Sequence, residues 1–455
     1  MNPADLSIVE AGRKIRDGSL SAVALAEAHL ERIDARDPTL QAFVAVTRER
    51  ALEDAARADR ELAEGQDRGP LHGIPIAIKD LIDTAGIATT SGSKLFADHV
   101  PDRNAAVVAR LREAGAVLLG KVMTYEFALV GPSFDLPFPP SRNPWNADHI
   151  TGGSSSGSAA AVSGGLVRTA IGTDTGGSIR SPASYCGIVG LKPTYERVSR
   201  DGVFPLSPSL DHVGPLSATV AEAALTLDAI SDAGALARLD EGVAGKRIGY
   251  ARAWFASDPE TDPAVLRAMD DAASTLSLLG ARIEEITLPD YALFEAAGAV
   301  IIQAEALAVH LEHLKTRRGD YGQLARQNLL TGLALDESDV TVARTAVTRL
   351  KSDLDAAFAL PFDAMITVNT LTPALPFDAF DGVNSVWTHM RTLPFNLTGH
   401  PVLAVPIGFS NGLPLGMQII GRHGDEAGIC AVGHAFEQAT DHAAHRPLIP
   451  TRRAG

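Results

Sequence analysis

Apolar and polar positions repeat along this chain with two periods, one typical of helices and the other typical of strands. Residues 1–65 show the helical period, with Ser21 as a plausible N-cap of one helix that ends at Pro38, and residues 48–64 as a second helix. We expect both helices to pack on the outside of a sheet, and we assign them no chemistry.

The strand period first occurs at residues 71–79, where Ile74, Ile76 and Ile78 alternate ahead of Lys79. Strands and helices then alternate along the chain, which predicts an α/β architecture with a partly parallel sheet. The further expected strands are residues 116–119, 167–173, 246–251, 281–288, 362–368, 401–408 and 413–421, of which the last two form a hairpin. The further expected helices are residues 104–114, 155–163, 220–231, 263–278, much of 294–355, and 425–440, whereas residues 195–214 are expected to be irregular.

Composition and charge narrow the class of protein. Of the 455 residues, 45% are hydrophobic and 21% are charged, which is enough to build a sizeable core. A net charge of −15 argues against nonspecific binding to nucleic acids or anionic membranes, which requires a basic surface. The two cysteines, Cys186 and Cys430, are too few for a disulfide scaffold or a cysteine-cluster zinc site. With no apolar signal region near the N-terminus and no run of eighteen apolar residues, a soluble cytoplasmic protein is expected.

Two segments rich in glycine and serine suggest a site made of backbone amides and hydroxyl groups. The first places four serines within residues 154–158, and the second is Gly176-Gly-Ser178. Glycine clusters usually indicate close backbone approach or unusual dihedral angles. An alanine-rich run follows the first segment, so a buried helix is expected there instead of a linker. The second segment leaves an expected strand, which would place Ser178 where successive N–H groups converge, as an oxyanion hole requires.

Residues 151–193 resemble the signature of the amidase signature family of serine hydrolases. The resemblance rests on Gly-Gly-Ser-Ser, Gly-Thr-Asp-Thr-Gly-Gly-Ser-Ile-Arg and Cys-Gly-Ile-Val-Gly-Leu-Lys-Pro-Thr, together with Gly73-Ile-Pro-Ile-Ala-Ile-Lys79 and Asn143-Pro-Trp145. It covers residues 70–220 strongly and 395–421 more loosely. It implies one large domain with a mixed, twisted sheet covered by helices. Its expected parts are an N-terminal helical region (1–65), the signature core (70–220) and a variable helical region (290–355) that forms a lid.

The same resemblance implies a Ser–cisSer–Lys triad. Ser178 would be the nucleophile, Ser154 would follow a cis peptide bond and relay the proton, and Lys79 would be the base. The 24 positions that separate the two serines match the family's spacing. Lysine can act as a base only when it is uncharged, a state that burial among the flanking isoleucines favours. Asp80 is expected to point away from Lys79, because neighbours on a strand alternate.

Supporting roles follow from the resemblance as well. The backbone amides expected to hold the oxyanion are those of Thr175, Gly176, Gly177 and Ser178. Supporting contacts around the triad are assigned to Ser155, Asp174 and Arg180. The expected substrate pocket consists of Tyr125, Phe127, Ala128, Leu129 and Val130. No cofactor and no metal are expected.

The expected function is hydrolysis of the C–N bond of a small-molecule amide or carbamate, through an acyl-enzyme on Ser178. The first alternative is the A-type component of a glutamyl- or aspartyl-tRNA amidotransferase, and the second is a carbamate (urethane) or allophanate hydrolase. The expected partner is the small-molecule substrate, without direct contact to nucleic acid or membrane, and a homodimer is a further possibility.

Short motifs both support and weaken the amidotransferase alternative. The segments that resemble the A-type component are Arg142-Asn-Pro-Trp145, Thr194-Tyr195 and Leu210-Asp211. The segments that depart from it are Tyr125-Glu-Phe-Ala-Leu-Val-Gly-Pro132 and Gly202-Val-Phe-Pro205.

Three other motifs compete with this interpretation. Gly115-Ala-Val-Leu-Leu-Gly-Lys121 has the spacing of a phosphate loop but lacks the Ser or Thr that should follow the lysine. Gly153-Ser-Ser-Ser-Gly157 matches a nucleophile elbow, with Ser155 as nucleophile, but no strand is expected directly before it. Ser91-Gly-Ser-Lys94 matches a β-lactamase start without its other motifs. The thirteen histidines form no His-Glu-x-x-His motif and no tight cluster in the sequence, so a metal hydrolase is not expected.

Overall fold

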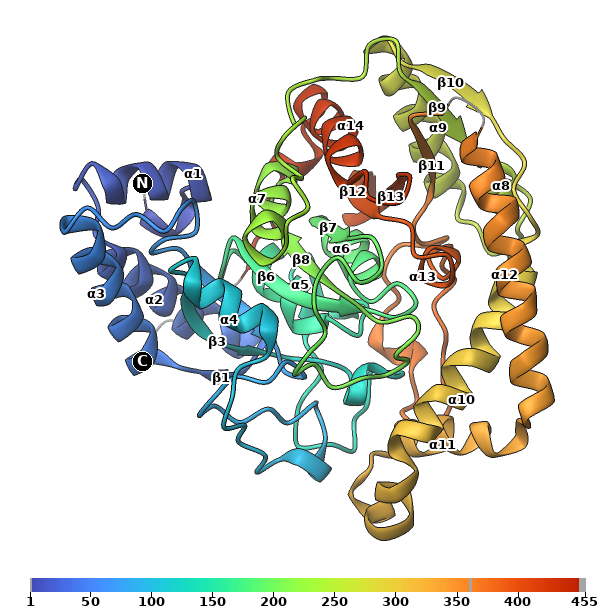
Figure 1. The fold of residues 1–455 in the computed structure, drawn as a ribbon, viewed down its shortest axis with the longest axis horizontal. Coiled ribbons are helices and arrows are strands. Elements are labelled where there is room, and N and C mark those ends of the chain that lie inside the picture. Colours follow the sequence, from blue (N-terminus) through green and yellow to red (C-terminus); the bar gives the residue numbers. More distant parts are fainter. Residues whose placement is uncertain (1, 360–361, 450–455) are drawn as a thin grey trace.

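The fold is built around one sheet of eleven strands, to which both halves of the chain contribute (Figure 1). The structure, a computed structural model, describes residues 2–359 and 362–449. The strand order in the sheet is β1-β3-β2-β6-β8-β7-β12-β13-β11-β9-β10. Its strands are β1 (Phe43–Val46), β2 (Pro75–Lys79), β3 (Val117–Val122), β6 (Thr169–Asp174), β7 (Val189–Lys192), β8 (His212–Ser217), β9 (Arg247–Tyr250), β10 (Arg282–Glu285), β11 (Ala364–Val368), β12 (Val402–Ser410) and β13 (Leu413–Ile420).

Strand pairing in this sheet is mixed, as expected. β2 lies parallel between β3 and β6, whereas β6, β8, β7, β12, β13 and β11 pair antiparallel in turn. The predicted hairpin is present: β12 and β13 pair across Asn411 and Gly412, whose φ angles are 51° and 79°. An Asn-Gly pair is favoured in such a turn because both residues tolerate positive φ. A small separate sheet pairs β4 (Arg142–Asn143) with β5 (Asn146–Ile150).

Helices cover the sheet and gather in two groups at opposite ends of the molecule (Figure 1). The N-terminal group is α1 (Ile8–Arg16), α2 (Ala22–Leu40) and α3 (Arg48–Ala63), and the opposite group is α10 (Tyr291–Arg317), α11 (Gln323–Thr331) and α12 (Glu337–Ala359). The remaining helices are α4 (Ala106–Glu113), α5 (Ser156–Ser163), α6 (Arg180–Cys186), α7 (Val220–Ile230), α8 (Ala253–Ala256), α9 (Pro263–Leu278), α13 (Pro394–Leu397) and α14 (Glu426–Ala439). The expected α/β fold with one continuous sheet is therefore confirmed.

Two short-range expectations for the N-terminal region differ from the structure. Ser21 caps α2 by accepting a hydrogen bond from the Ala24 N–H, as expected, but the helix continues past Pro38 to Leu40. Pro38 lacks the N–H that would bond the carbonyl four residues earlier, and only two helical residues follow it, so it disturbs the last turn alone. The strand β1 was not expected, because it has four residues and pairs with β3 along one edge only.

The expectation that no segment could span a bilayer is not met on length and composition. The helical segment Tyr291–Asp320 contains an 18-residue window of mean hydropathy 1.6, of which 28% is buried. One such helix is weak evidence for a membrane span, since the core helix of a folded domain has the same properties. Here α10 packs against α11, α12 and α13.

Candidate active site

Lys79 ends β2 inside the protein, beside two hydroxyl groups. Its Nζ lies 2.8 Å from Ser154 Oγ and 2.7 Å from Thr173 Oγ1, and its side chain has no exposed surface. Thr173 belongs to β6, the parallel neighbour of β2, so the pairing of the two strands brings it to Lys79. The structure therefore joins Lys79 and Ser154, as expected, and adds Thr173, which lies in the quoted Gly-Thr-Asp-Thr motif but was assigned no role.

No carboxylate pairs with Lys79 among the residues that the structure describes. The adjacent Asp80 points the other way, as expected: its Oδ1 lies 3.1 Å from Nζ of Lys121 on β3. Burial lowers the pKa of Lys79 to about 7, against the opposing effect of the Asp174 and Asp211 charges. A lysine in water titrates near about 10.4, so this site holds a substantial fraction of uncharged amine at neutral pH.

Ser154 and Ser155 lie side by side but have different surroundings. The peptide bond between Gly153 and Ser154 is cis, as the resemblance implies. Ser155 Oγ donates to the Thr173 carbonyl at 3.0 Å and accepts from the Thr173 N–H at 3.2 Å. A hydroxyl held in this way, with no exposed surface, supports the backbone of β6 and is not available as a nucleophile.

The nucleophile-elbow hypothesis needs one correction. A strand, β5, does precede Gly153-Ser-Ser-Ser-Gly157, although none was expected there. It pairs only with β4, outside the main sheet. The strand was missed because its first three residues are exposed and polar or small, which removes the apolar alternation. The contacts of Ser155, and not the absence of a strand, argue against the elbow.

The phosphate-loop motif is likewise accounted for by packing. Residues 117–122 form the buried strand β3, as the sequence indicated, so their N–H groups serve the sheet. Nζ of Lys121, the lysine of the motif, contacts the Ile82 carbonyl at 2.9 Å and Thr89 Oγ1 at 2.7 Å, besides Asp80.

Ser178 lies in the turn between β6 and α6 and is partly exposed. Its carbonyl accepts from the Ser155 N–H at 3.3 Å, which ties the two serine segments together. Gly177 has φ 137°, and a Cβ there would lie 2.3 Å from Thr392 Oγ1. Glycine is therefore required at this position by both conformation and space.

The turn narrows the set of amides that could hold an oxyanion. The Gly177 N–H donates to Asp174 Oδ1 at 2.8 Å, so it is already engaged. The amides of Thr175, Gly176 and Ser178 have no hydrogen-bond acceptor within the described part of the chain. The Gly177 amide, which was expected to hold the oxyanion, therefore stabilises the turn through Asp174 instead. The amides of Thr175, Gly176 and Ser178 remain candidates for the oxyanion hole.

Arg180 and Asp174 form a fully buried ion pair beneath this turn. All five N–H groups of Arg180 are satisfied, by Asp174, the Thr392 carbonyl, Gln418 and Asn396, at distances of 2.6–2.9 Å. Although burial alone raises the pKa of the Asp174 carboxyl, the Arg180 guanidinium holds it well below its usual range. The pair anchors the turn that carries Ser178 to the C-terminal segment, which the resemblance covers only loosely and to which no role was assigned.

We expect Asp174→Asn to lower the free energy of unfolding by about 3–5 kcal/mol, because it leaves a buried guanidinium without its counter-charge. Chemical denaturation at neutral pH measures this loss. Asp232→Asn is the matched control, since the Asp232 carboxylate pairs with Arg110 while its side chain is 89% exposed; a change below about 1 kcal/mol is expected there. Equal losses in the two variants would contradict a structural role for the Arg180–Asp174 pair.

A cavity of about 100 Å³ opens at Ser178. Four of the five expected pocket residues line it: Tyr125, Ala128, Leu129 and Val130. Phe127 does not. Its side chain has no exposed surface and packs among the rings of Phe96, Phe204, His310 and Tyr321.

The opposite wall of the cavity comes from α10, which lies in the variable helical region (290–355) expected to form a lid, and from the segment 386–390, which sequence reasoning did not single out. Ile302 on α10 and the segment 386–390 complete it, with Trp387 and Met390 as the large side chains. A second cavity of about 300 Å³ shares Leu129, Gly176, Ile302 and the segment 387–390 with the first. It extends along α10 past Glu295 to Tyr291. No sequence pattern marks residues 386–390 as part of the site, because they meet it only through the tertiary fold.

Comparison with known proteins places this geometry in a family. The family model for amidases matches residues 24–430. The A-type component of glutamyl-tRNA(Gln) amidotransferase from Carboxydothermus hydrogenoformans is 39% identical over 98% of this chain and 99% of its own length. Among solved structures, an inhibitor-bound chain from a vestigial complex related to an s-triazine catabolic enzyme superposes with a TM-score of 0.88 at 34% identity, covering 95% and 98% of the two chains. Native peptide amidase from Stenotrophomonas maltophilia superposes with a TM-score of 0.85 at 32% sequence identity, and the match covers 98% of each chain. The chain belongs to the amidase signature family, whose members act on C–N bonds.

Proposed function

We propose that this chain hydrolyses an amide C–N bond through an acyl-enzyme on Ser178, with Ser154 and Lys79 moving the proton. One observation carries this proposal above the others: a buried lysine without a carboxylate partner among the described residues lies 2.8 Å from the hydroxyl of a serine. A charged ammonium has three N–H groups to satisfy, and only two oxygen atoms contact Lys79 Nζ within the described residues. The uncharged amine suits this surrounding better.

The proposed reaction begins with proton transfer. Ser178 Oγ gives its proton to Ser154 Oγ, which passes its own proton to Lys79 Nζ, while Ser178 Oγ bonds to the carbonyl carbon of the substrate. A serine hydroxyl becomes an effective nucleophile only when a base removes its proton in this way. The C–N bond then breaks, and the leaving nitrogen takes the proton back from Lys79 through Ser154. Water, activated by the same relay, hydrolyses the acyl-enzyme and restores Ser178.

Negative charge on the carbonyl oxygen needs donors that are in place beforehand. We assign this role to the amides of Thr175, Gly176 and Ser178, which have no other acceptor in the described residues. Gly176 and Ser178 line the cavity together with Thr175, so the three residues border the space where an amide would bind. One such donor typically contributes about 10²–10³ in rate.

The comparisons support the amidotransferase alternative better than a free-standing small-molecule amidase. The relatives found at 36–39% identity over nearly the whole chain are A-type components of glutamyl-tRNA(Gln) amidotransferases. We therefore propose, as the first setting for this chemistry, an A-type component that releases ammonia from a carboxamide and acts together with a partner protein.

A specific observation favours the small-molecule amidase as a second candidate. Glutamine carries an α-carboxylate, and a pocket that binds it needs a cationic side chain or a comparable set of donors. Neither of these two cavities is lined by Lys or Arg, and Glu295 is their one charged residue within the described chain. A third cavity, which shares Ala128, Thr175 and Leu206 with the first, is lined by Arg200 and by Asp211, so its charges are balanced. This lining suits uncharged or cationic acyl groups of amides or carbamates.

We also propose that α10, which forms one wall of both cavities, acts as part of a lid over these cavities.

A substrate panel separates the two settings. Ammonia or amine release is measured with glutamine, an uncharged aliphatic amide, an aryl amide and a carbamate, with and without a co-expressed B-type amidotransferase component. The A-type setting predicts stable co-purification and glutamine hydrolysis in the complex. Turnover of the uncharged amides by the isolated chain, without glutamine hydrolysis in either preparation, would contradict that setting and support the second. Hydrolysis of none of the four compounds would contradict the amidase proposal itself.

A further inference from the structure

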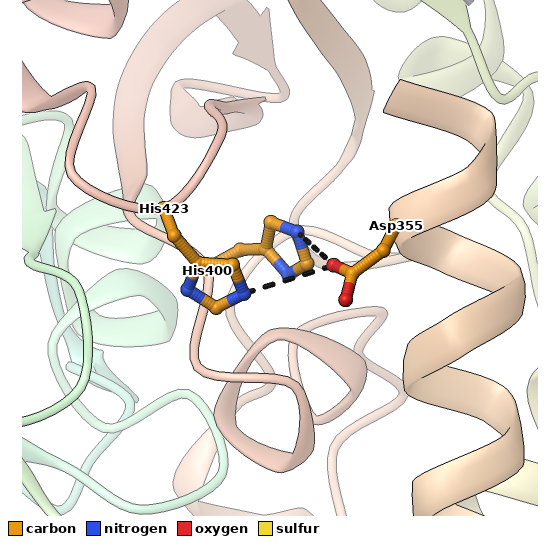
Figure 2. Close-up of side chains that lie close together, drawn as sticks. All are labelled: Asp355, His400 and His423. Carbon is orange, nitrogen blue, oxygen red and sulfur yellow. Dashed lines mark ion pairs between the residues drawn. The ribbon is translucent and has the colours of Figure 1, made fainter. Parts of the chain in front are cut away.

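Two histidines and a carboxylate from three separate segments meet near the C-terminal end of α12 (Figure 2). Asp355 lies on α12, His400 lies just before β12, and His423 follows β13. His400 Nε2 is 3.1 Å from Asp355 Oδ1, and His423 Nε2 is 3.7 Å from the same oxygen. None of the three lines a cavity at Ser178. The cluster therefore lies outside the site of the proposed amidase chemistry.

A lysine ammonium marks this position as one that receives a cation. Nζ of Lys351 lies 2.6 Å from His423 Nε2, 2.9 Å from the Thr398 carbonyl and 3.6 Å from Asp355 Oδ2. An ammonium has donors only, so His423 Nε2 must accept and carries no proton. Its lone pair already points into the cluster, which is the state in which a histidine binds a metal ion.

His400 is held firmly in the orientation that such a ligand needs. The residue is almost fully buried, its Nδ1 lies 2.9 Å from Thr398 Oγ1, and its ring stacks on Phe358 with an interplanar angle of 18°. Histidine ligands of metals usually hydrogen-bond through the other ring nitrogen, which fixes the ring and its tautomer. Thr398 therefore supports both His400, through its hydroxyl, and the cation position, through its carbonyl.

We propose that Asp355, His400 and His423 form a binding site for a divalent transition-metal ion of the Zn²⁺ class. Two imidazole nitrogens and one carboxylate oxygen are a donor set that such ions favour. Metal–ligand bonds of about 2.0–2.2 Å in tetrahedral geometry separate the ligand atoms by about 3.3–3.6 Å. The separations of 3.1 and 3.7 Å from Asp355 Oδ1 lie close to that range, and the three ligand atoms all lie within 4.8 Å of one another.

The ion would link elements that are far apart in the sequence. It would join α12, the last helix of the group α10–α12, to the two ends of the β12–β13 hairpin. Because α10 packs on α12 and also lines the cavity at Ser178, the site would hold that cavity wall in place. Lys351 is the internal competitor, since its ammonium occupies the cation position when no ion is bound.

The test is Zn²⁺ titration of the full-length, chelator-treated protein in competition with a chromogenic chelator. The wild type is expected to bind one equivalent of Zn²⁺. The affinity of His423→Gln for Zn²⁺ is expected to be lower by at least about 100-fold. Lys351→Met is expected to bind about tenfold more tightly than the wild type, because a like charge is removed from the site. His99→Gln is the matched control, since His99 is a half-exposed histidine 3.6 Å from a single carboxylate, Asp83.

Stability measurements on the same proteins provide a second readout. Zn²⁺ is expected to raise the thermal denaturation midpoint of the wild type and of His99→Gln, and to leave that of His423→Gln unchanged. Equal stoichiometry and affinity for the wild type and His423→Gln would overturn the site. None of these measurements depends on amide hydrolysis, so they stand apart from the proposed function.

Discussion

Ser178→Ala is expected to lower kcat for amide hydrolysis by about 10⁴-fold or more, the size of effect seen when the nucleophile of a serine hydrolase is removed. The reason is chemical: the two neighbouring serines cannot take its place. Ser154 and Ser155 are fully buried, and Ser155 Oγ is bonded in both directions to the backbone of Thr173. The measurement is the rate of amine or ammonia release by the purified variant, with circular dichroism to confirm the fold.

Ser158→Ala is the matched control for this experiment. Ser158 belongs to the same serine cluster, but its Oγ donates to the Ile171 carbonyl from the buried face of α5. The control is expected to keep its activity within a few-fold of the wild type. Residual turnover by Ser178→Ala within tenfold of the wild type would show that another group is the nucleophile.

Lys79→Met is expected to lower kcat by about 10³–10⁴-fold, the contribution of a well-placed general base, while the protein stays folded. Methionine keeps the length and apolar stem of lysine but cannot take a proton. Its effect on stability has two opposing parts. The variant leaves the Ser154 and Thr173 hydroxyls without a partner, at a cost of about 1–3 kcal/mol each. It also removes the cost of burying an amine.

That second part follows from the pKa of Lys79. The folded protein has a value of about 7, against about 10.4 in an unfolded chain. Between these values the unfolded chain binds more protons, so wild-type stability rises with pH across this window, and the lysine costs roughly 4–5 kcal/mol at pH 7 and below. We therefore expect the free energy of unfolding of Lys79→Met at pH 7 to lie between about 2 kcal/mol below and about 3 kcal/mol above that of the wild type.

Lys121→Met provides the contrasting control. Lys121 is equally buried, but its ammonium neutralises Asp80 at 3.1 Å. Removing it leaves a buried carboxylate unpaired, and a loss of about 3–5 kcal/mol in the free energy of unfolding is expected. The two variants thus differ: Lys79→Met loses activity and keeps its stability, whereas Lys121→Met loses stability. Lys79→Met that still hydrolyses amides within tenfold of the wild type would contradict the role of Lys79 as base.

Much of the site's centre could be predicted from sequence because it lies on contiguous motifs. Lys79 ends an apolar strand, and Ser154 and Ser178 each follow a glycine pair, so local pattern and family resemblance point to the same residues. The cis peptide bond before Ser154 and the direction of Asp80, away from Lys79, also agree with the structure. The same holds for the long, strongly periodic helices and for the β12–β13 hairpin.

What was missed depends on contacts between distant segments. Strand β8 lies partly in a stretch expected to be irregular, because Gly214 and Pro215 interrupt its alternation, and its partners β6 and β7 supply the pairing. Phe127 was assigned to the pocket because its neighbours in the sequence were. Its φ is 52°, in the left-handed region, and its side chain packs into an aromatic cluster instead. The cluster of Asp355, His400 and His423 has no trace in the sequence, since its members come together only when α12 packs against the ends of β12 and β13.

The central claim is that an uncharged Lys79 activates Ser178, and the pH dependence of covalent labelling tests it most directly. An uncharged fluorophosphonate reagent should modify Ser178, identified by mass spectrometry of the labelled peptide. The second-order rate constant is expected to rise about tenfold per pH unit below the Lys79 pKa of about 7 and to level off above it. The rise should be absent in Lys79→Met. A rate constant that does not change between pH 5 and 8, or labelling of Lys79→Met as fast as the wild type, would contradict the account.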